Sequence, residues 1–243
     1  MRPVNRLGPA VRLLGVVTGL RAGLGAVCRL WFPGAEVVLS QVVEWRPLWP
    51  AAWTAPPPAT PLPVLLTCPL PRPDWGRVPA SVSLSGPGCP ATLTNNLRVV
   101  YNTPPRGKTK KKFAVCVKGL DFPNTDLSVR LVEWLELLSI LGVDKIFLYN
   151  LAVHPNVTKV LSHYTARGLV DLAPLSLPDH LPNQAQLRHT FLAGSRTVKR
   201  QQELVPYNDC LYRNMYRYQY IGLFDVGTCQ ILRHSLTKTK NNC

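Results

Sequence analysis

The second half of the chain alternates apolar runs with stretches in which apolar residues recur at helical spacing. Phe113–Val117 and Lys145–Tyr149 are short, mostly apolar runs, which are typical of strands buried on both faces. Two further runs, Leu169–Leu172 and Tyr220–Phe224, have the same character, and the last one ends on Asp225. Between the first three runs, apolar residues recur every three or four positions, as they do on the buried face of a helix, and the connections are short. This order predicts an α/β domain with a mostly parallel sheet.

The last helix of this domain is predicted directly before the fourth run. We expect it to begin at Pro206 or Tyr207, since proline suits the first turn of a helix, and to end at Arg217. Asn208 and Asp209 would then lie in its first turn, where a capping role and a role in a binding site are equally open.

Proline dominates the segment before this domain. Of the 24 prolines, 15 fall between Pro47 and Pro105, and prolines at this density exclude long helices. Short apolar runs between them predict a small, loop-rich β module over residues 41–105, followed by a basic linker at 106–112. The α/β domain then covers 113–227. Residues 228–243 are polar and basic without a pattern, and we expect an unstructured tail there.

Residues 1–40 contain an apolar stretch, Val11–Phe32, that Arg21 divides into two short runs. A membrane-spanning helix needs about 20 apolar residues, and a central arginine costs roughly 2.5 to 3.5 kcal/mol on insertion. We therefore predict no stable transmembrane helix in this segment. A signal peptide and an arginine-rich transit peptide both stay open.

Charge and cysteine content narrow the classes of function. The net charge of +15 would permit nonspecific contact with phosphate backbones, but no aromatic residues interleave with the lysines of 108–112. A solvated charge run is the better interpretation, so we expect no specific nucleic-acid binding.

The seven cysteines include no Cys-X-X-Cys pair, which argues against structural zinc. Disulfides in a lumenal protein and buried thiols in a cytosolic one are equally compatible with them, and the sequon Asn156-Val157-Thr158 is compatible with the lumen.

The candidate binding residues follow the predicted strands. Ligands bind open parallel sheets outside the carboxyl ends of the strands, and these ends carry Lys118, Asn150 and Asp225. A carboxylate such as Asp225 suits Mg²⁺ or Mn²⁺, and either ion can neutralise a diphosphate. The alternative is that Asp225 merely ends a strand.

Several stretches resemble glycosyltransferase family 92, formerly domain of unknown function 23. They are Val132–Glu136, Leu141–Asn150, Tyr207–Arg213 and Phe224–Val226. The resemblance implies a GT-A type, Rossmann-like nucleotide-sugar domain that is incomplete in this chain. It also implies a secretory-pathway or Golgi protein, usually with one membrane anchor, that transfers galactose from UDP-galactose to a glycan acceptor. Lys118, Asn150 and Asp225 become nucleotide-sugar-binding residues in this view.

The chain departs from the family pattern after Asp225, which matches the first aspartate of the Asp-X-Asp metal motif. Where the family resembles Phe-Asp-Val-Asp-Glu, this chain reads Phe224-Asp225-Val226-Gly227-Thr228. Gly227 removes the second carboxylate, so we expect weakened Mn²⁺ or Mg²⁺ binding at Asp225. The likeness is expected to end at Val226, which suggests a truncated product without an assignable catalytic base. We therefore expect a hexosyltransferase by descent that is itself inactive, or alternatively a catalytically inactive lumenal fragment acting at most as a binding or interaction module.

Overall fold

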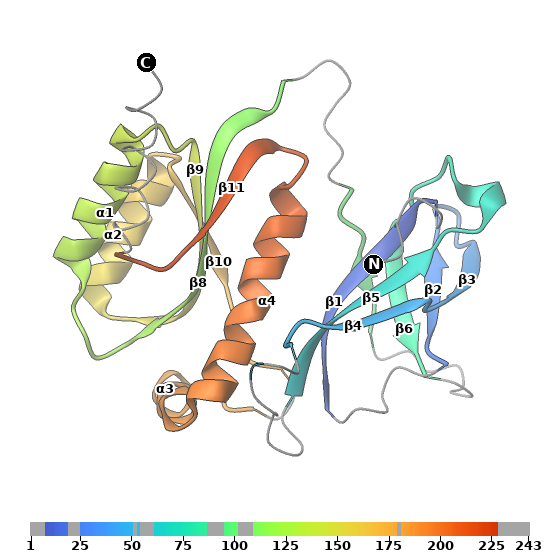
Figure 1. The fold of residues 1–243 in the computed structure, drawn as a ribbon, viewed down its shortest axis with the longest axis horizontal. Coiled ribbons are helices and arrows are strands. Elements are labelled where there is room, and N and C mark those ends of the chain that lie inside the picture. The colour runs from blue at the N-terminus through green and yellow to red at the C-terminus, as the bar shows by residue number, and fades with distance from the viewer. Residues whose placement is uncertain are drawn as a thin grey trace. The chain divides into compact units, whose positions relative to one another are not determined.

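The computed structural model describes residues 8–18, 25–50, 53, 61–86, 95–101, 109–178 and 181–227. These residues belong to two compact units, 1–101 and 102–243, each with its own buried core. The ribbon in Figure 1 is labelled with the strands and helices named below.

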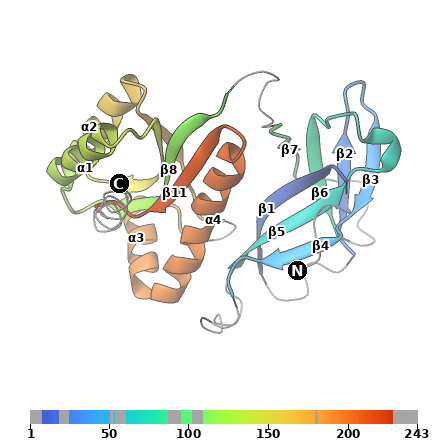
Figure 2. The same ribbon diagram turned by 45° about the horizontal axis from the view of Figure 1, so that its top comes forward.

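The first unit is built from two antiparallel sheets, as the views in Figures 1 and 2 show. The three-stranded sheet has the order β1-β5-β4, and the four-stranded sheet has the order β3-β2-β6-β7. Between them lie buried aliphatic side chains such as Leu30 and Leu66, together with a disulfide that joins Cys28 of β2 to Cys68 of β5. The strands are β1 (Ala10–Thr18), β2 (Val27–Trp31), β3 (Val37–Gln41), β4 (Glu44–Pro47), β5 (Pro61–Pro69), β6 (Ser81–Ser85) and β7 (Leu97–Arg98).

The boundary expected at residue 40 is not a boundary in the structure. Strands β1, β2 and most of β3 come from residues 1–40, and β1 pairs along its whole length with the proline-rich strand β5. The apolar runs on either side of Arg21 are too short for a spanning helix but long enough for strands of nine and five residues. Residues 19–24, with Arg21, lie outside the described part. None of the described helices has the length and apolar character needed to cross a membrane.

The second unit is a parallel α/β fold, which confirms the fold class expected for this half. Its sheet has the order β10-β9-β8-β11, and each neighbouring pair is parallel. The three runs at 113–117, 145–149 and 220–224 therefore lie in one sheet. Its strands are β8 (Lys111–Phe122), β9 (Lys145–Val153), β10 (Val170–Pro174) and β11 (Tyr218–Phe224). Strand β8 begins within the expected linker 106–112, and the expected tail at 228–243 lies outside the described residues.

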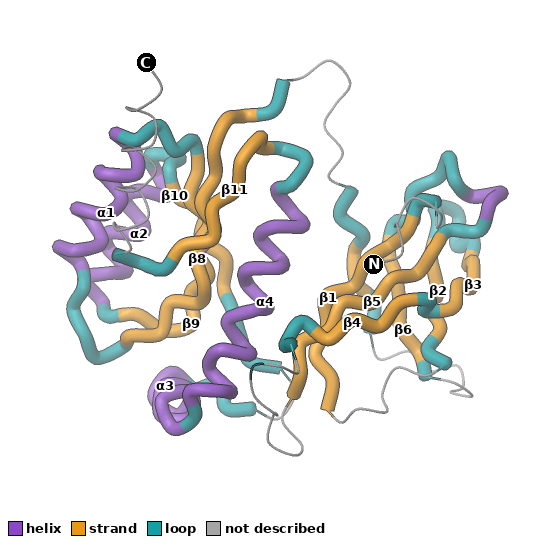
Figure 3. The backbone as a smooth tube through the Cα atoms, in the orientation of Figure 1, coloured by secondary structure: helices purple, strands orange, loops and turns teal. Residues whose placement is uncertain are grey.

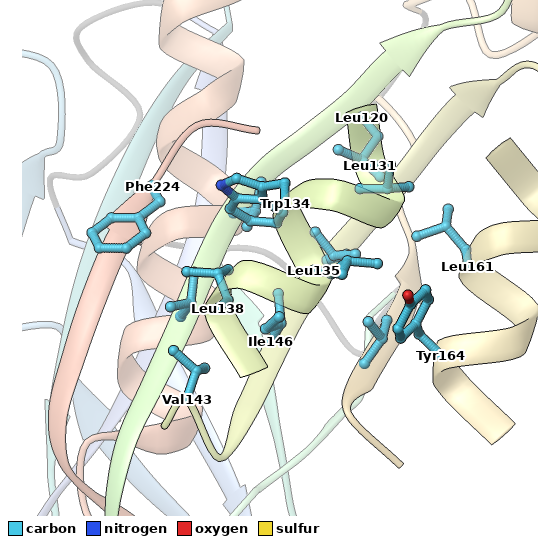
Figure 4. Close-up of a cluster of buried hydrophobic side chains, with 14 of the residues drawn as sticks. Leu120, Leu131, Trp134, Leu135, Leu138, Val143, Ile146, Leu161, Tyr164 and Phe224 are labelled. Atoms are coloured by element: carbon cyan, nitrogen blue, oxygen red, sulfur yellow. The ribbon is translucent and has the colours of Figure 1, made fainter. Parts of the chain in front are cut away.

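Helices cover both faces of this sheet, as the tube in Figure 3 makes clear. Helices α1 (Ser128–Ile140) and α2 (Pro155–Ala166) lie on one face, and α4 (Arg196–Asn214) lies on the other. Figure 4 shows side chains of α1, among them Trp134, Leu135 and Leu138, gathered over the sheet. Their spacing of three and four residues places them on the one face of α1 that is buried.

The helix before β11 is longer than the sequence indicated. Helix α4 begins at Arg196, where Ser195 Oγ accepts a hydrogen bond from the Val198 amide, so Pro206 lies in its interior. An interior proline costs about 3 kcal/mol because it removes one helical hydrogen bond. Burial of Val198 and Cys210 against the rest of the unit opposes that cost.

The sequence pattern did not predict helix α3 (Ala185–Gly194), because the side chains on its buried face are not all apolar. Its buried side chains are Arg188 and Leu192, whereas Leu187 is exposed. A pattern search that expects apolar residues on the inner face of a helix does not detect a buried arginine.

Two aliphatic residues of α1 provide a test of this packing. Leu135 is fully buried, whereas Ile140 is 80% exposed. We expect Leu135→Ala to lower the free energy of unfolding of the second unit by about 2 to 5 kcal/mol, through lost contacts and a residual cavity. The matched variant Ile140→Ala should change it by no more than about 0.5 kcal/mol. Urea unfolding curves measure both, and equal losses would show that α1 is packed differently.

Candidate functional site

The register of two parallel strands brings the first two candidate residues together. Strand β11 pairs with β8 so that Phe224 lies opposite Val117. The residues that follow are therefore neighbours: Asp225 comes directly after β11, whereas Lys118 lies within β8, which continues to Phe122 instead of ending at Val117 as expected. Lys118 Nζ lies 3.2 Å from Asp225 Oδ2.

Helix α4 adds two side chains to this pair. Glu203 Oε1 lies 3.0 Å from the same Lys118 ammonium. The hydroxyl of Tyr207 lies 2.8 Å from Asp225 Oδ1 and 3.1 Å from the carbonyl oxygen of Phe224, and it donates to this pair of acceptors. We call Lys118, Glu203, Tyr207 and Asp225 the Lys118 cluster.

The electrostatics of the cluster keep Lys118 charged and Tyr207 protonated. Burial disfavours the charged form of Lys118, but hydrogen bonds and charges from Glu203 and Asp225 outweigh it and raise the pKa of Lys118. Burial and the hydrogen bond to Asp225 raise the pKa of Tyr207, so this hydroxyl keeps its proton. Asp225 has 48% of its side chain exposed, against 28% for Lys118 and 19% for Glu203. Asp225 is thus the member of the cluster most open to a ligand.

Two contacts hold α4 so that its side chains of the cluster lie beside Lys118. Glu203 and Tyr207 are four residues apart and therefore lie on one face of the helix. Further along, a disulfide joins Cys210 to Cys116 of β8, with their Cα atoms 5.9 Å apart. Near it, the Tyr149 hydroxyl donates to Asp209 Oδ2 at 2.7 Å, which ties α4 to β9 as well.

Asp209 and Asn208 lie inside α4 rather than at its start, so the capping role considered from the sequence is wrong. The Arg213 Nε atom donates to Asp209 at 2.8 Å, one turn further along the helix. Asn208 Nδ2 donates to the Leu204 carbonyl at 2.8 Å. Both side chains are therefore used in holding the helix and its contact with the sheet.

Asn150, the third candidate, is not joined to the cluster. Along β9 its neighbours alternate between the faces, with Leu148 in the core beneath α1 and α2 and Tyr149 in the core beneath α4. By the same alternation Asn150 belongs to the α1–α2 face, whereas Lys118 contacts α4. Asn150 Oδ1 is buried without a hydrogen-bond partner among the residues that the structure describes.

A second polar group at this edge of the sheet was not expected. Near the end of β8, the buried Asp121 has Oδ2 at 3.0 Å from His189 Nδ1 of α3. The neighbouring Arg188 donates to the carbonyl oxygen of Leu151 at the end of β9. These contacts dock α3 onto the carboxyl ends of β8 and β9.

Sequence reasoning missed Glu203 and Tyr207 because the helix was expected to begin too late. With a start near Pro206, Glu203 would lie in a loop and Tyr207 would be a first-turn residue. The spacing of four between them was the signal that could have paired them on one helical face. His189 carried no comparable signal, since its partner Asp121 is 68 residues away.

Comparison with models of known protein families gives a match. A family model described as "Glycosyltransferase family 92" matches residues 111–235, just over half of the 243-residue chain. The match covers all of the Lys118 cluster, and it runs past Val226, where the likeness was expected to end. No curated protein matches the sequence at a significant level.

The hydrogen bond from Tyr207 to Asp225 is open to a direct test. We expect Tyr207→Phe to lower the free energy of unfolding by about 1.5 kcal/mol, the low end of the range for bonds to charged groups, because Asp225 is half exposed. Tyr216→Phe is the matched control, since Tyr216 is an exposed tyrosine near the end of the same helix. Thermal or urea unfolding of both variants measures the difference, and an equal effect would speak against the bond.

Proposed function

Because the chain belongs to glycosyltransferase family 92, we propose that its α/β unit binds a UDP-sugar at the Lys118 cluster for hexose transfer to a glycan acceptor. Galactose is the sugar proposed. The observation that carries the proposal is the Lys118 ammonium beside the exposed Asp225 carboxylate, at the edge where parallel sheets bind ligands.

The charge of the cluster bears on how a diphosphate could bind. One ammonium is shared by two carboxylates, so the cluster holds one more negative than positive charge. A diphosphate would be repelled by that balance unless a further cation entered. A metal ion would therefore complete the site electrostatically.

The donor set fits a divalent ion held partly by substrate. The described residues contain no group of three or more His, Cys, Asp or Glu side chains arranged to bind a metal. Asp225 and Glu203, however, already converge on one cation, the Lys118 ammonium. Mg²⁺-type sites commonly use one or two carboxylates and complete their shell with substrate phosphates and water. Asp225 and Glu203 would hold Mn²⁺ or Mg²⁺, which would neutralise the developing charge of the UDP leaving group.

The other members of the cluster have separate roles in this proposal. Lys118 donates charged hydrogen bonds to phosphate oxygens, for which a lysine ammonium is well suited. Tyr207 holds Asp225 in place through its hydroxyl. Glu203 supplies a second carboxylate from α4, in a chain where Gly227 stands at the family's second aspartate.

Gly227 favours a second candidate function, binding of the donor without transfer. Its φ angle of 84° lies in the left-handed region, which most side chains avoid, and it has no carboxylate to offer. A lumenal binding module of this kind would keep the fold and the Lys118 cluster while lacking catalytic power.

We also propose that the chain matures in the secretory pathway, with membrane association there. The supporting observation is the pair of disulfides, Cys28–Cys68 and Cys116–Cys210. Structural disulfides persist in oxidising compartments and are rare in the cytosol.

Metal binding by the two carboxylates can be measured without activity. We expect Asp225→Asn and Glu203→Gln each to weaken Mn²⁺ binding by about tenfold or more, a loss that even outer-shell changes produce. Glu133→Gln, at an exposed position on α1, should leave it unchanged. Isothermal titration with Mn²⁺, in the presence and absence of UDP, reads out all three variants. Unchanged binding in both cluster variants would place the metal elsewhere.

Transfer itself should be absent from the chain as printed. We expect no galactose transfer from UDP-galactose above background with Mn²⁺, since losing one stabilising group can cost about 10² to 10³ in rate. Gly227→Asp should tighten Mn²⁺ binding, because aspartate adopts the left-handed region more readily than most residues. It should not restore transfer, because it supplies no base to deprotonate the acceptor hydroxyl. Transfer by the unchanged chain at an ordinary enzymatic rate would contradict the second candidate function, binding of the donor without transfer.

A further inference from the structure

We propose that Asn156 is the acceptor of an N-linked oligosaccharide when the chain passes through the endoplasmic reticulum lumen. Asn156-Val157-Thr158 is the single Asn-X-Ser/Thr sequon of the sequence in which X is not proline. Nothing in the proposed donor site bears on this modification, so it stands independently of the transferase proposal.

The structure places the acceptor amide at the surface. Asn156 lies in the first turn of α2, directly after Pro155, and its side chain is exposed. Its Nδ2 atom donates to Asp126 Oδ2 at 2.7 Å. A glycosylated amide keeps one N–H group, so this hydrogen bond can persist with the sugar attached.

The surroundings of Asn156 leave room for a glycan. Two residues that contact Asn156, Asp126 and His154, are themselves partly exposed. Helix α2 covers the face of the sheet opposite α4. The oligosaccharide would therefore leave the protein on the α1–α2 side rather than from the helix that carries Glu203 and Tyr207.

Burial within the sequon indicates when the sugar is added. Val157, its middle residue, is completely buried in the core beneath α2, whereas Thr158 is exposed. An enzyme that must bind all three residues can reach Val157 only before α2 packs. Transfer therefore precedes folding of the second unit.

The chemistry needs one co-reactant, a lipid-diphosphate-linked oligosaccharide. A bond forms between Asn156 Nδ2 and the anomeric carbon of the first sugar, and the bond from that carbon to the phosphate oxygen breaks. The lipid diphosphate leaves with the bonding electrons. The amide gives up one proton to a base of the transferring enzyme.

Two disulfides supply the second line of support. Cys28–Cys68 and Cys116–Cys210 both require an oxidising compartment, and the lumen that provides it also holds the glycosylation machinery. The sequon alone occurs often by chance. Here the sequon coincides with an exposed acceptor amide and with a disulfide in each unit, and this combination favours glycosylation of Asn156.

The experiment expresses the full chain behind a cleavable secretion signal in mammalian cells. Electrophoretic mobility is compared before and after peptide-N-glycosidase treatment, and mass spectrometry locates the aspartate that this enzyme leaves at the glycosylated position. Asn156→Gln and Thr158→Ala both destroy the sequon, and Thr158→Ser keeps it as the matched control. Formation of the Cys116–Cys210 disulfide reports folding in each variant.

We expect one enzyme-sensitive shift in the parent chain and in Thr158→Ser, and none in Asn156→Gln or Thr158→Ala. Such a result with the disulfide formed in all four proteins establishes Asn156 as the acceptor. An unshifted parent chain overturns the proposal, and so does a shift that survives Asn156→Gln.

Discussion

Burial of strand β8 on both faces is the constraint on which the second unit depends. Ala114 and Cys116 face α4, while Val115 and Val117 face α1 and α2, and all four are completely buried. A strand with no solvent-facing side requires a helical layer on each side. The disulfide between Cys116 and Cys210 fixes one of those layers covalently. Lys118 follows directly, so its position beside the carboxyl end of β11 results from the packing of the residues before it.

The sequence predicted the site residues whose positions follow from the order of the strands. It did not predict those whose positions depend on where a helix begins or on a partner far away in the sequence. Lys118 and Asp225 could be placed at one edge because apolar runs mark their strands. Glu203 could not, because a proline inside α4 gives the same local signal as a proline at a helix start. Asn150 lies within β9 rather than after it, and strand alternation assigns it to the opposite face from Lys118. Strand β1 was missed because its pairing partner, β5, lies over 40 residues away in the sequence.

Gly227, where the resemblance leads us to expect an aspartate, is distinctive in its backbone as well as in its lack of a side chain. The chain turns there with a φ angle of 84°, a conformation suited to glycine. Glu203 approaches the same cation from α4, so carboxylate chemistry at this edge comes from a helix and a strand end together. The cluster is therefore assembled from segments more than 100 residues apart, between Lys118 and Asp225, and exists only in the folded unit.

The contacts of Asp126 have a consequence for acidic surroundings. Its carboxylate accepts from Asn156 Nδ2 and from the Ser128 amide, so it links the first turns of α1 and α2. These hydrogen bonds lower the pKa of Asp126 to about 2. A carboxyl with a depressed pKa contributes stability above its unfolded value, and that contribution is lost only as the pH falls through the folded value. The link between the two helices thus remains ionised at mildly acidic pH, where a histidine-based contact would change its charge.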